Sequence, residues 1–293
     1  MDRSERAALA AIPVAIVAAA GIALAGGQGG AVLDGLPVFA VCVALAFIIQ
    51  WIAFVPAFLL RTEKFYDLTG SLTYLLTTVT AVLLSPETGA RSLLLLILIA
   101  IWSIRLGTFL FGRIRAAGED RRFREIKRSW PRFLLAWTLQ GLWVTFSLAA
   151  ALAAITAGTR TPLGPVGWAG LAIWILGFGI EVVADRQKSA FNAVPENKGR
   201  FIDSGLWAWS RHPNYFGEIV LWLGVAVIAA PALRGWGWLT LISPVFVALL
   251  LTRISGVNLL EARADEKWGG QEEYEAYKSS TPVLIPRPPG RTK

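Results

Sequence analysis

Two carboxylates stand four residues apart near the end of an apolar stretch in the second half of the sequence. Glu181 and Asp185 fall on one face of the helix expected there. Two negative charges at the C-terminal end of a helix oppose its dipole and repel each other, so helix propensity does not explain them. Charged groups at membrane depth are costly and are therefore functional hypotheses by default. We expect Glu181 and Asp185 to meet a partner group.

The segment AWSRHPNYFGEI, residues 208–219, predicts an anion-binding helix start. Pro213 suits the first turn of a helix, where its missing N–H costs nothing and the following amides are free. Arg211 and His212 directly precede it, so a phosphate could meet a cation, an imidazole and backbone N–H groups together. A capped helix with an interfacial basic pair is the plainer interpretation. The first turn is then lined by Asn214, Tyr215 and Glu218.

The connecting loop, residues 185–207, is rich in turn-forming and basic residues. A solvated loop is one interpretation of it. The other is a flap over a flat ring, with cations that meet phosphates. The aromatic residues of this flap are Phe191, Phe201 and Trp207, and its cations are Lys188, Lys198 and Arg200.

An arginine inside an apolar stretch marks another place for chemistry. Arg105 lies in the fourth such stretch, and Glu63, Tyr66 and Asp67 precede or open the third. A buried arginine needs a counter-charge or a polar ligand. Two interpretations of Arg105 remain open. One is a structural ion pair with Asp67 or Glu181, and the other is a role in binding a substrate.

Several classes of site are excluded by composition. The sequence has one cysteine, Cys42, and one histidine, His212, so disulfides, thiolate clusters and His-rich metal centres are not expected, and we predict no metal site. The glycines at 177 and 179 do not continue into a GxGxxG pattern between strand and helix. Any nucleotide must therefore be held in another way.

The elements that position these residues are apolar helices. The chain of 293 residues is 55% hydrophobic and 16% charged, with a mean hydropathy of +0.55, and we predict a single all-α membrane domain. We expect about eight transmembrane helices (seven to eight), the first being a retained helix and no cleaved signal. The expected spans are residues 7–25, 37–60, 68–85, 92–112, 133–157, 165–184, 213–231 and 235–256.

The distribution of positive charge predicts the orientation of these spans. If both termini are cytoplasmic, 24 of the 28 Lys and Arg residues lie in cytoplasmic segments, as the positive-inside rule requires. The net charge of +8 is then explained by topology and by contact with anionic membrane lipids, so no nucleic-acid role is expected.

The motifs DRQK, PENKGRFIDSGLWAWSRHPNYFGE and EEYEAYKSSTPVLIP resemble those of the steroid 5α-reductase superfamily, in particular its bacterial branch of membrane proteins. The likeness covers about residues 175–285, is weaker over 60–130, where KFYDLTGSLTY, WSIRLG and GEDRRFREIKR stand, and is absent from the first helix.

This resemblance implies a bundle of seven or more helices that binds NADPH at the cytoplasmic side of its C-terminal helices. Hydride would pass from the nicotinamide to an enone or a similarly activated C=C, with Glu261 on the last helix closing the site. Residues 1–160 would form the cavity for a lipid substrate, and 161–293 the cofactor site. The expected cofactor residues are Arg105, Glu181, Asp185, Lys188, Phe191, Asn197, Arg200, Leu206, Trp207, Arg211, His212, Asn214, Tyr215, Glu218 and Glu261.

The expected catalytic residues depart from the family. Its members use an acidic side chain and a tyrosine hydroxyl to hydrogen-bond the substrate carbonyl and stabilise the enolate. Trp102 replaces that tyrosine here, and Glu63 matches the acidic residue loosely. An indole N–H can donate a hydrogen bond but cannot deliver a proton, so Tyr66 is the candidate acid. We predict Tyr66, Glu63 and Trp102 as the catalytic residues.

The nearest alternative is a membrane methyltransferase of the isoprenylcysteine or phospholipid type, which uses S-adenosylmethionine. Those proteins also resemble this chain in an RHPxYxG segment, but they carry paired glutamates where NLLEAR has Glu261 alone. A lipid-binding or transport protein is the third reading, disfavoured by the apolar outer halves of the spans. We expect a monomer in the bacterial inner membrane that acts on a hydrophobic steroid or isoprenoid-like lipid.

Overall fold

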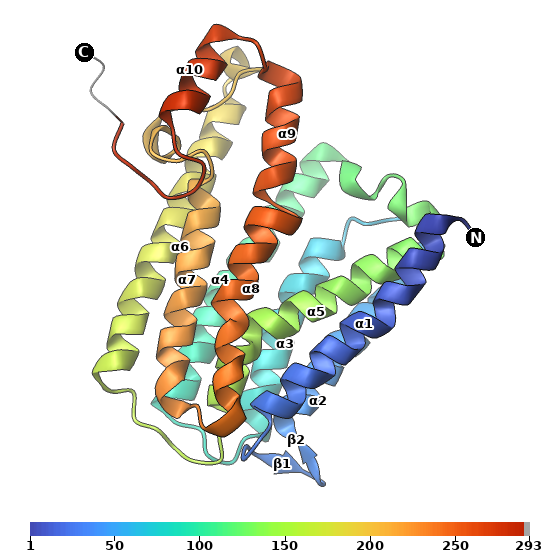
Figure 1. The fold of residues 1–293 in the computed structure, drawn as a ribbon, viewed down its shortest axis with the longest axis vertical. Coiled ribbons are helices and arrows are strands. Elements are labelled where there is room, and N and C mark those ends of the chain that lie inside the picture. Colours follow the sequence, from blue (N-terminus) through green and yellow to red (C-terminus); the bar gives the residue numbers. More distant parts are fainter. Residues whose placement is uncertain (290–293) are drawn as a thin grey trace. The chain divides into compact units, whose positions relative to one another are not determined.

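The computed structural model is an α-helical membrane protein, and it describes residues 1–289 except the side chains of Ala117 and Arg121 (Figure 1). Arg291 and Lys293 of the charge count therefore lie outside the described residues. Eight helical segments within the described residues are long and apolar enough to span a bilayer, which confirms the predicted fold class. The cytoplasmic position of the two termini stays a prediction.

The last span differs from the expected one. The sequence predicted a helix over 235–256, but the helical segment runs on to Trp268 and changes its winding three times. A 3₁₀ stretch over Gly235–Leu241 leads into α8 (Ile242–Leu249), and a π turn over Leu250–Ile254 separates α8 from α9 (Val257–Trp268). The glycine and proline content of this region explains the irregular start, and π turns often mark functional sites.

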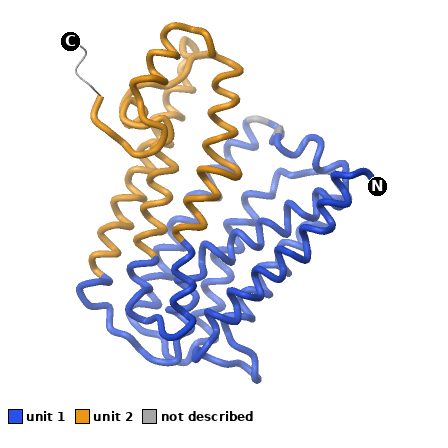
Figure 2. The backbone as a smooth tube through the Cα atoms, viewed as in Figure 1, with its two compact units in different colours: residues 1–167, 226–243 blue, residues 168–225, 244–293 orange. Residues whose placement is uncertain are grey.

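The chain divides into two compact units (Figure 2). The first comprises residues 1–167 and 226–243, and the second comprises residues 168–225 and 244–293. The first unit contains α1 (Arg3–Gly26), a hairpin of β1 (Val32–Leu33) and β2 (Leu36–Pro37), α2 (Val38–Leu59), α3 (Tyr66–Leu84), α4 (Ala90–Ala117) and α5 (Trp130–Ile155).

Helix α5 is the centre of the first unit. It packs against α1, α2 and α3, and its alanine-rich end is almost completely buried, from Leu148 to Ile155. Small side chains in this stretch let the neighbouring helices approach closely, which is how helices associate in a bilayer that offers no hydrophobic driving force. A capping box of Asp2 and Glu5 starts α1, because each side chain accepts a hydrogen bond from the other's backbone N–H.

Glycines bring the two long helices of the second unit into backbone contact. A Cβ atom on Gly177 of α6 (Gly164–Ala193) would lie 2.4 Å from the amide nitrogen of Leu221 in α7 (Pro213–Ala229). A Cβ on Gly217 would lie 2.6 Å from the amide nitrogen of Glu181, and one on Gly224 would lie 2.6 Å from that of Trp174. The close approach therefore needs small residues at these positions.

The second unit ends in two polar helices and a tail. After the π turn, α9 (Val257–Trp268) and α10 (Glu272–Ser280) follow, and the tail returns to the segment before α7. The amide of Arg211 donates to the carbonyl of Pro282 at 2.9 Å, and the amide of Arg287 donates to that of Trp209 at 2.9 Å. These bonds fix the polar segment that opens α7.

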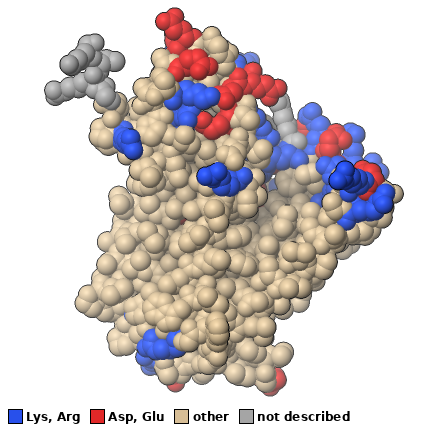
Figure 3. Space-filling model, viewed as in Figure 1, with Lys and Arg blue, Asp and Glu red and all other residues tan. Residues whose placement is uncertain are grey.

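Charged side chains gather at helix ends and loops. On the face drawn in Figure 3, Lys, Arg, Asp and Glu cluster around α9 and α10 in the second unit. In the first unit, they cluster near the N-terminus and the α4–α5 connection. On that face, the stretches of helix between these clusters show few charged side chains, which suits contact with lipid because charged groups at membrane depth are costly.

Candidate functional site

The segment before α7 places the guanidinium of Arg211 and the imidazole of His212 at the start of that helix. Ser210 accepts a hydrogen bond from the amide of His212 at 3.2 Å and donates one to the carbonyl of Leu284 at 2.8 Å. His212 is 6% exposed, and its ring stacks on that of Tyr215 at 5.8 Å between centroids. Arg211 and His212 are thus held directly before the first turn of the helix Pro213–Ala229, where the sequence predicts backbone N–H groups without helical partners.

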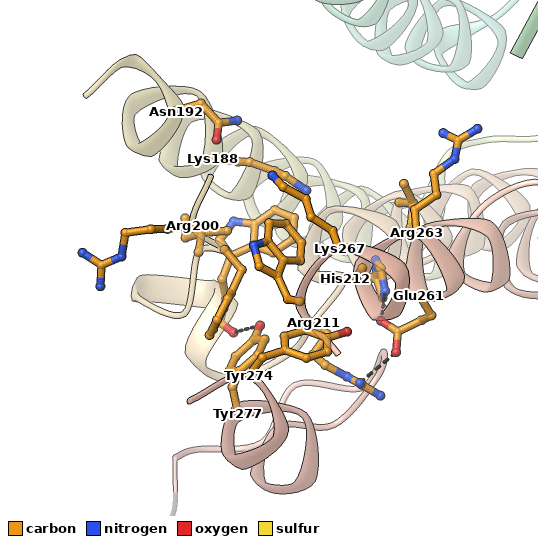
Figure 4. A pocket seen from close by; sticks show the side chains of 16 residues that line it. Lys188, Asn192, Arg200, Arg211, His212, Glu261, Arg263, Lys267, Tyr274 and Tyr277 are labelled. Atoms are coloured by element: carbon orange, nitrogen blue, oxygen red, sulfur yellow. Dashed lines mark hydrogen bonds and ion pairs between the residues drawn. The ribbon is translucent and has the colours of Figure 1, made fainter. Parts of the chain in front are cut away.

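A carboxylate from α9 reaches both of these side chains. Glu261 Oε1 lies 2.7 Å from His212 Nε2, and its Oε2 lies 2.8 Å from Arg211 Nη1 (Figure 4). Gly256 lets α9 start beside Tyr215, because a Cβ there would lie 2.8 Å from the tyrosine ring. The sequence singled out Glu261, and the structure brings it to Arg211 and His212.

A cavity of about 260 Å³ opens beside this group. Among the described residues that line it, five are Lys or Arg and one is a carboxylate. The cations are Lys188, Arg200, Arg211, Arg263 and Lys267. An excess of positive charge in a partly enclosed cavity attracts anions and concentrates the field.

Aromatic rings form much of the remaining lining. Lys188 Nζ lies 4.3 Å from the centroid of the Trp207 ring, and Lys267 Nζ lies 4.3 Å from that of Trp268. Trp207 is fixed by a hydrogen bond from its indole to the carbonyl of Ala184 at 3.0 Å, and Tyr277 donates to the carbonyl of Trp207 at 2.7 Å. Burial raises the pKa of the Tyr277 phenol above its usual value. The rings offer flat surfaces for a planar group.

Three buried carboxylates lie on α6 and α7 at the same end of the unit. Glu181, Asp185 and Glu218 are between 2% and 8% exposed. The side-chain amide of Asn214 donates to Asp185 Oδ1 at 3.2 Å, so the structure brings together the two motifs that the sequence singled out separately. Their proximity follows from the glycine contacts between α6 and α7.

Several predicted loop residues support the loop and do not line the cavity. Asn197 donates through its side-chain amide to the carbonyl of Phe191 at 2.9 Å, and the amide of Leu206 donates to Gln187 at 2.9 Å. Phe191 and Leu206 pack against the small core of Ala184, Ile202 and Trp207. These contacts shape the segment that carries Lys188, Arg200 and Trp207.

The predicted catalytic residues Tyr66 and Glu63 lie in the first unit, where both make firm contacts. The Tyr66 hydroxyl donates to the carbonyl of Ala136 at 2.9 Å, and its ring packs on Phe123 at 4.6 Å. Glu63 is 3% exposed, accepts from the amide of Asp120 at 2.9 Å and forms an ion pair with Lys127 at 2.6 Å. Their roles in catalysis remain predictions.

Trp102 and Arg105 lie on α4, also in the first unit. Trp102 is 2% exposed and meets the ring of Tyr74 edge-on at 5.0 Å, and Arg105 lies over the ring of Phe109 at 5.2 Å. Tyr74 is a buried tyrosine that the sequence reasoning missed. Its position two turns after Asp67 on α3 was the available signal.

Most of the cavity residues that the sequence did not predict lie on α9 and α10. Arg263, Lys267, Trp268 and Tyr274 line the cavity but were not predicted from the sequence as site residues. A partial signal was present on α9, where Val257, Leu260, Ala264 and Trp268 follow at helical spacing and Arg263 and Lys267 stand four residues apart. Interspersed acidic residues concealed the cations by giving the segment a mixed charge.

Comparisons with known proteins agree with the resemblance found in the sequence. The chain is 26% identical over 185 residues to an uncharacterised protein of Schizosaccharomyces pombe, covering 52% of this chain and 54% of that protein. It is 29% identical over 118 residues to bovine 3-oxo-5-alpha-steroid 4-dehydrogenase 1, with 40% of each chain covered. It is 30% identical over 120 residues to steroid 5-alpha-reductase DET2 of Arabidopsis thaliana, again with 40% of each covered.

These alignments span about half of the first relative and two fifths of the two reductases. No solved structure matches the chain. A family model covers more: the one described as protein of unknown function (DUF1295) matches residues 53–281. The chain belongs to the DUF1295 family, which is part of the steroid 5α-reductase superfamily.

Proposed function

We propose that this protein is a membrane-embedded, NADPH-dependent reductase that transfers hydride to an activated C=C of a hydrophobic steroid or isoprenoid-like lipid. The observation that carries the proposal is the cation-lined cavity at the start of α7, found in a member of the steroid 5α-reductase superfamily. The protein would act as a monomer in a bacterial inner membrane, with both termini in the cytoplasm.

The residues present fit a phosphorylated dinucleotide. Arg211 Nε is buried and has no hydrogen-bond partner among the described residues, which leaves a donor for a ligand. Lys188, Arg200 and Arg211 would bind phosphates, and the ring of Trp207 offers a flat surface to a base. The cavity of about 260 Å³ suits a phosphorylated ribose, so the rest of the dinucleotide would extend beyond it.

The polar groups on α6 and α7 suit the neutral parts of the same molecule. Asp185 and Glu218 can accept hydrogen bonds from ribose hydroxyls, and the amide of Asn214 can both donate and accept. Bound NADPH would supply the hydride. The protein's own task is then to orient the nicotinamide and to exclude water from it.

Two tasks would remain for residues of the first unit: stabilising the enolate and supplying a proton. After hydride adds to the β-carbon of an enone, negative charge develops on the carbonyl oxygen, and a proton must reach the α-carbon. Trp102 would donate a hydrogen bond to that oxygen, and Tyr66 would be the source of the proton. Trp102 contacts Tyr74, which lies about 12 Å after Tyr66 along α3, so the proton would travel through an intervening group once Tyr66 gives up its bond to the carbonyl of Ala136. Glu63, paired with Lys127, would hold the Tyr66 end of α3 in place.

The nucleotide itself provides the test. Protein extracted in mild detergent and then denatured should release NADP(H), identified by mass spectrometry. S-adenosylmethionine in its place would establish the methyltransferase reading, and the absence of any nucleotide after incubation with NADPH would refute the pocket.

Two variants locate the site. Asn214→Ala and Glu218→Ala should abolish NADPH binding, measured by nucleotide fluorescence, without lowering the thermal midpoint by more than a few degrees. Asn258→Ala is the matched control, because Asn258 is exposed and bonds only the carbonyl of Arg253 among the contacts described. Unchanged affinity in the first two variants would contradict the proposed pocket.

A further inference from the structure

Glu261 places a carboxylate where an anionic ligand would bind. Its two oxygens contact His212 Nε2 at 2.7 Å and Arg211 Nη1 at 2.8 Å, directly before the start of α7. It is the one acidic residue among the described residues that line the cavity, against five cations. A carboxylate has the charge sign and the acceptor oxygens of a phosphate, so it can satisfy the same partners.

The carboxylate satisfies these partners incompletely. The Arg211 side chain is 10% exposed, and its contact with Glu261 is an ion pair without hydrogen-bond geometry. Its Nε also has no hydrogen-bond partner within residues 1–289. A phosphate brings three acceptor oxygens and up to two negative charges, so one oxygen could accept from Nη1 with hydrogen-bond geometry while another contacts His212. A phosphate is therefore the better occupant.

The two sides of this contact are held with different firmness. Arg211 and the preceding Ser210 are tied to the tail by bonds to the carbonyls of Pro282 and Leu284. Glu261 belongs to α9, which is joined to α8 through the π turn Leu250–Ile254. Trp268 and Asp265 tie α9 to Gly199 and to α10, so the part that can withdraw is the Glu261 side chain, which is 20% exposed against 10% for Arg211.

We propose that Glu261 occupies the phosphate subsite in the ligand-free protein and that the phosphate of the ligand displaces it. Glu261 then sets the affinity of the cavity by competing for Arg211 and His212. The identity of the ligand as NADPH rests on the proposed function, whereas the competition requires only a phosphate group.

Equilibrium dialysis of the full chain in detergent, with 2′-AMP, 5′-AMP and NADP⁺ as separate probes, measures the competition. Glu261→Gln should tighten binding of the phosphate-bearing probes by about ten-fold, because the internal competitor loses its charge. Glu266→Gln removes the same charge from an exposed position on α9 and should leave the affinities within about two-fold. Arg211→Gln should weaken binding in either background. A gain for 2′-AMP alone assigns the subsite to a 2′-phosphate, and a gain for 5′-AMP alone assigns it to the pyrophosphate.

The sole histidine allows direct observation of the displacement. With ¹⁵N-labelled histidine, the ring signals belong to His212 alone. Saturating 2′-AMP or 5′-AMP should move the Nε2 signal of the wild type further than that of Glu261→Gln, whose starting signal already lacks the carboxylate. Equal or weaker binding in Glu261→Gln would overturn the inference even if NADPH binds to the wild type. Tighter phosphate binding without any binding of NADPH would uphold it and refute the proposed cofactor.

Discussion

The contact between α6 and α7 predicts a sharp difference between two glycines two residues apart. In Gly177→Ala, the new Cβ would lie 2.4 Å from the amide nitrogen of Leu221 and 2.6 Å from the carbonyl oxygen of Gly217. Ordinary Cβ contacts begin near 3.4 Å, so the two backbones must separate by about 1 Å. Gly179→Ala is the matched control, since no heavy atom lies within 4 Å of its added Cβ.

The magnitude follows from two opposing effects. Overpacking a closely fitted interface costs about 1–3 kcal/mol, and the cost is at the upper end where the obstacle is backbone. Alanine stabilises a helix by about 0.5–1 kcal/mol relative to glycine. The net expectation is a loss of on the order of 1–2 kcal/mol for Gly177→Ala and a change within about 0.5 kcal/mol for Gly179→Ala.

Separation of the helices also acts on the site. The bond from Asn214 to Asp185 is already 3.2 Å long, so a shift of about 1 Å breaks it. Thermal unfolding in detergent, followed by tryptophan fluorescence, should show a midpoint several degrees lower for Gly177→Ala, together with weaker NADPH binding. Identical midpoints and affinities for the two variants would refute the close backbone contact.

Three further perturbations test other parts of the fold. Arg91→Gln should destabilise the first unit by about 3 kcal/mol, because Arg91 is 3% exposed and donates to four backbone carbonyls. Arg160→Gln removes an exposed ion pair and should change stability by less than about 1 kcal/mol. Chemical unfolding of the two variants measures the difference. Lys127→Met should lower stability by about 3–5 kcal/mol, since it leaves the carboxylate of Glu63 buried without its cation, and Glu63→Gln in the same chain should restore part of the loss. Burial raises the folded-state pKa of Tyr277 above its usual value. The contribution of Tyr277 to stability is therefore complete below about pH 10 and is lost as the pH rises through the folded-state pKa. Tyr277→Phe should remove this alkaline dependence of stability, measured by unfolding at a series of pH values.

The spans could be predicted because a bilayer imposes a simple length criterion. Eight apolar stretches were expected, and eight helices of sufficient length and hydropathy occur in the described residues. Hydropathy says nothing about winding, however. The 3₁₀ and π turns on either side of α8 depend on packing against neighbours, so the expected end of the last span at residue 256 fell twelve residues short.

The site could be predicted where a motif is local and was missed where it depends on tertiary contact. Arg211, His212 and Asn214 belong to one continuous segment, and a proline at a helix start identifies its geometry. Lys267 and Trp268 belong to a helix whose approach to that segment is fixed by the π turn and by the returning tail. No local pattern encodes that approach.

The charge count illustrates why topology and function were hard to separate in the sequence. The positive-inside rule accounted for 24 of the 28 Lys and Arg residues, and this explanation needed no binding site. Yet five of those same residues line one cavity, where a single carboxylate faces them. A bilayer selects cations on one side whatever their neighbours, whereas an anion site requires them to converge. The discriminating observation is therefore that convergence, together with a buried cationic donor, Arg211 Nε, that has no hydrogen-bond partner within the described residues.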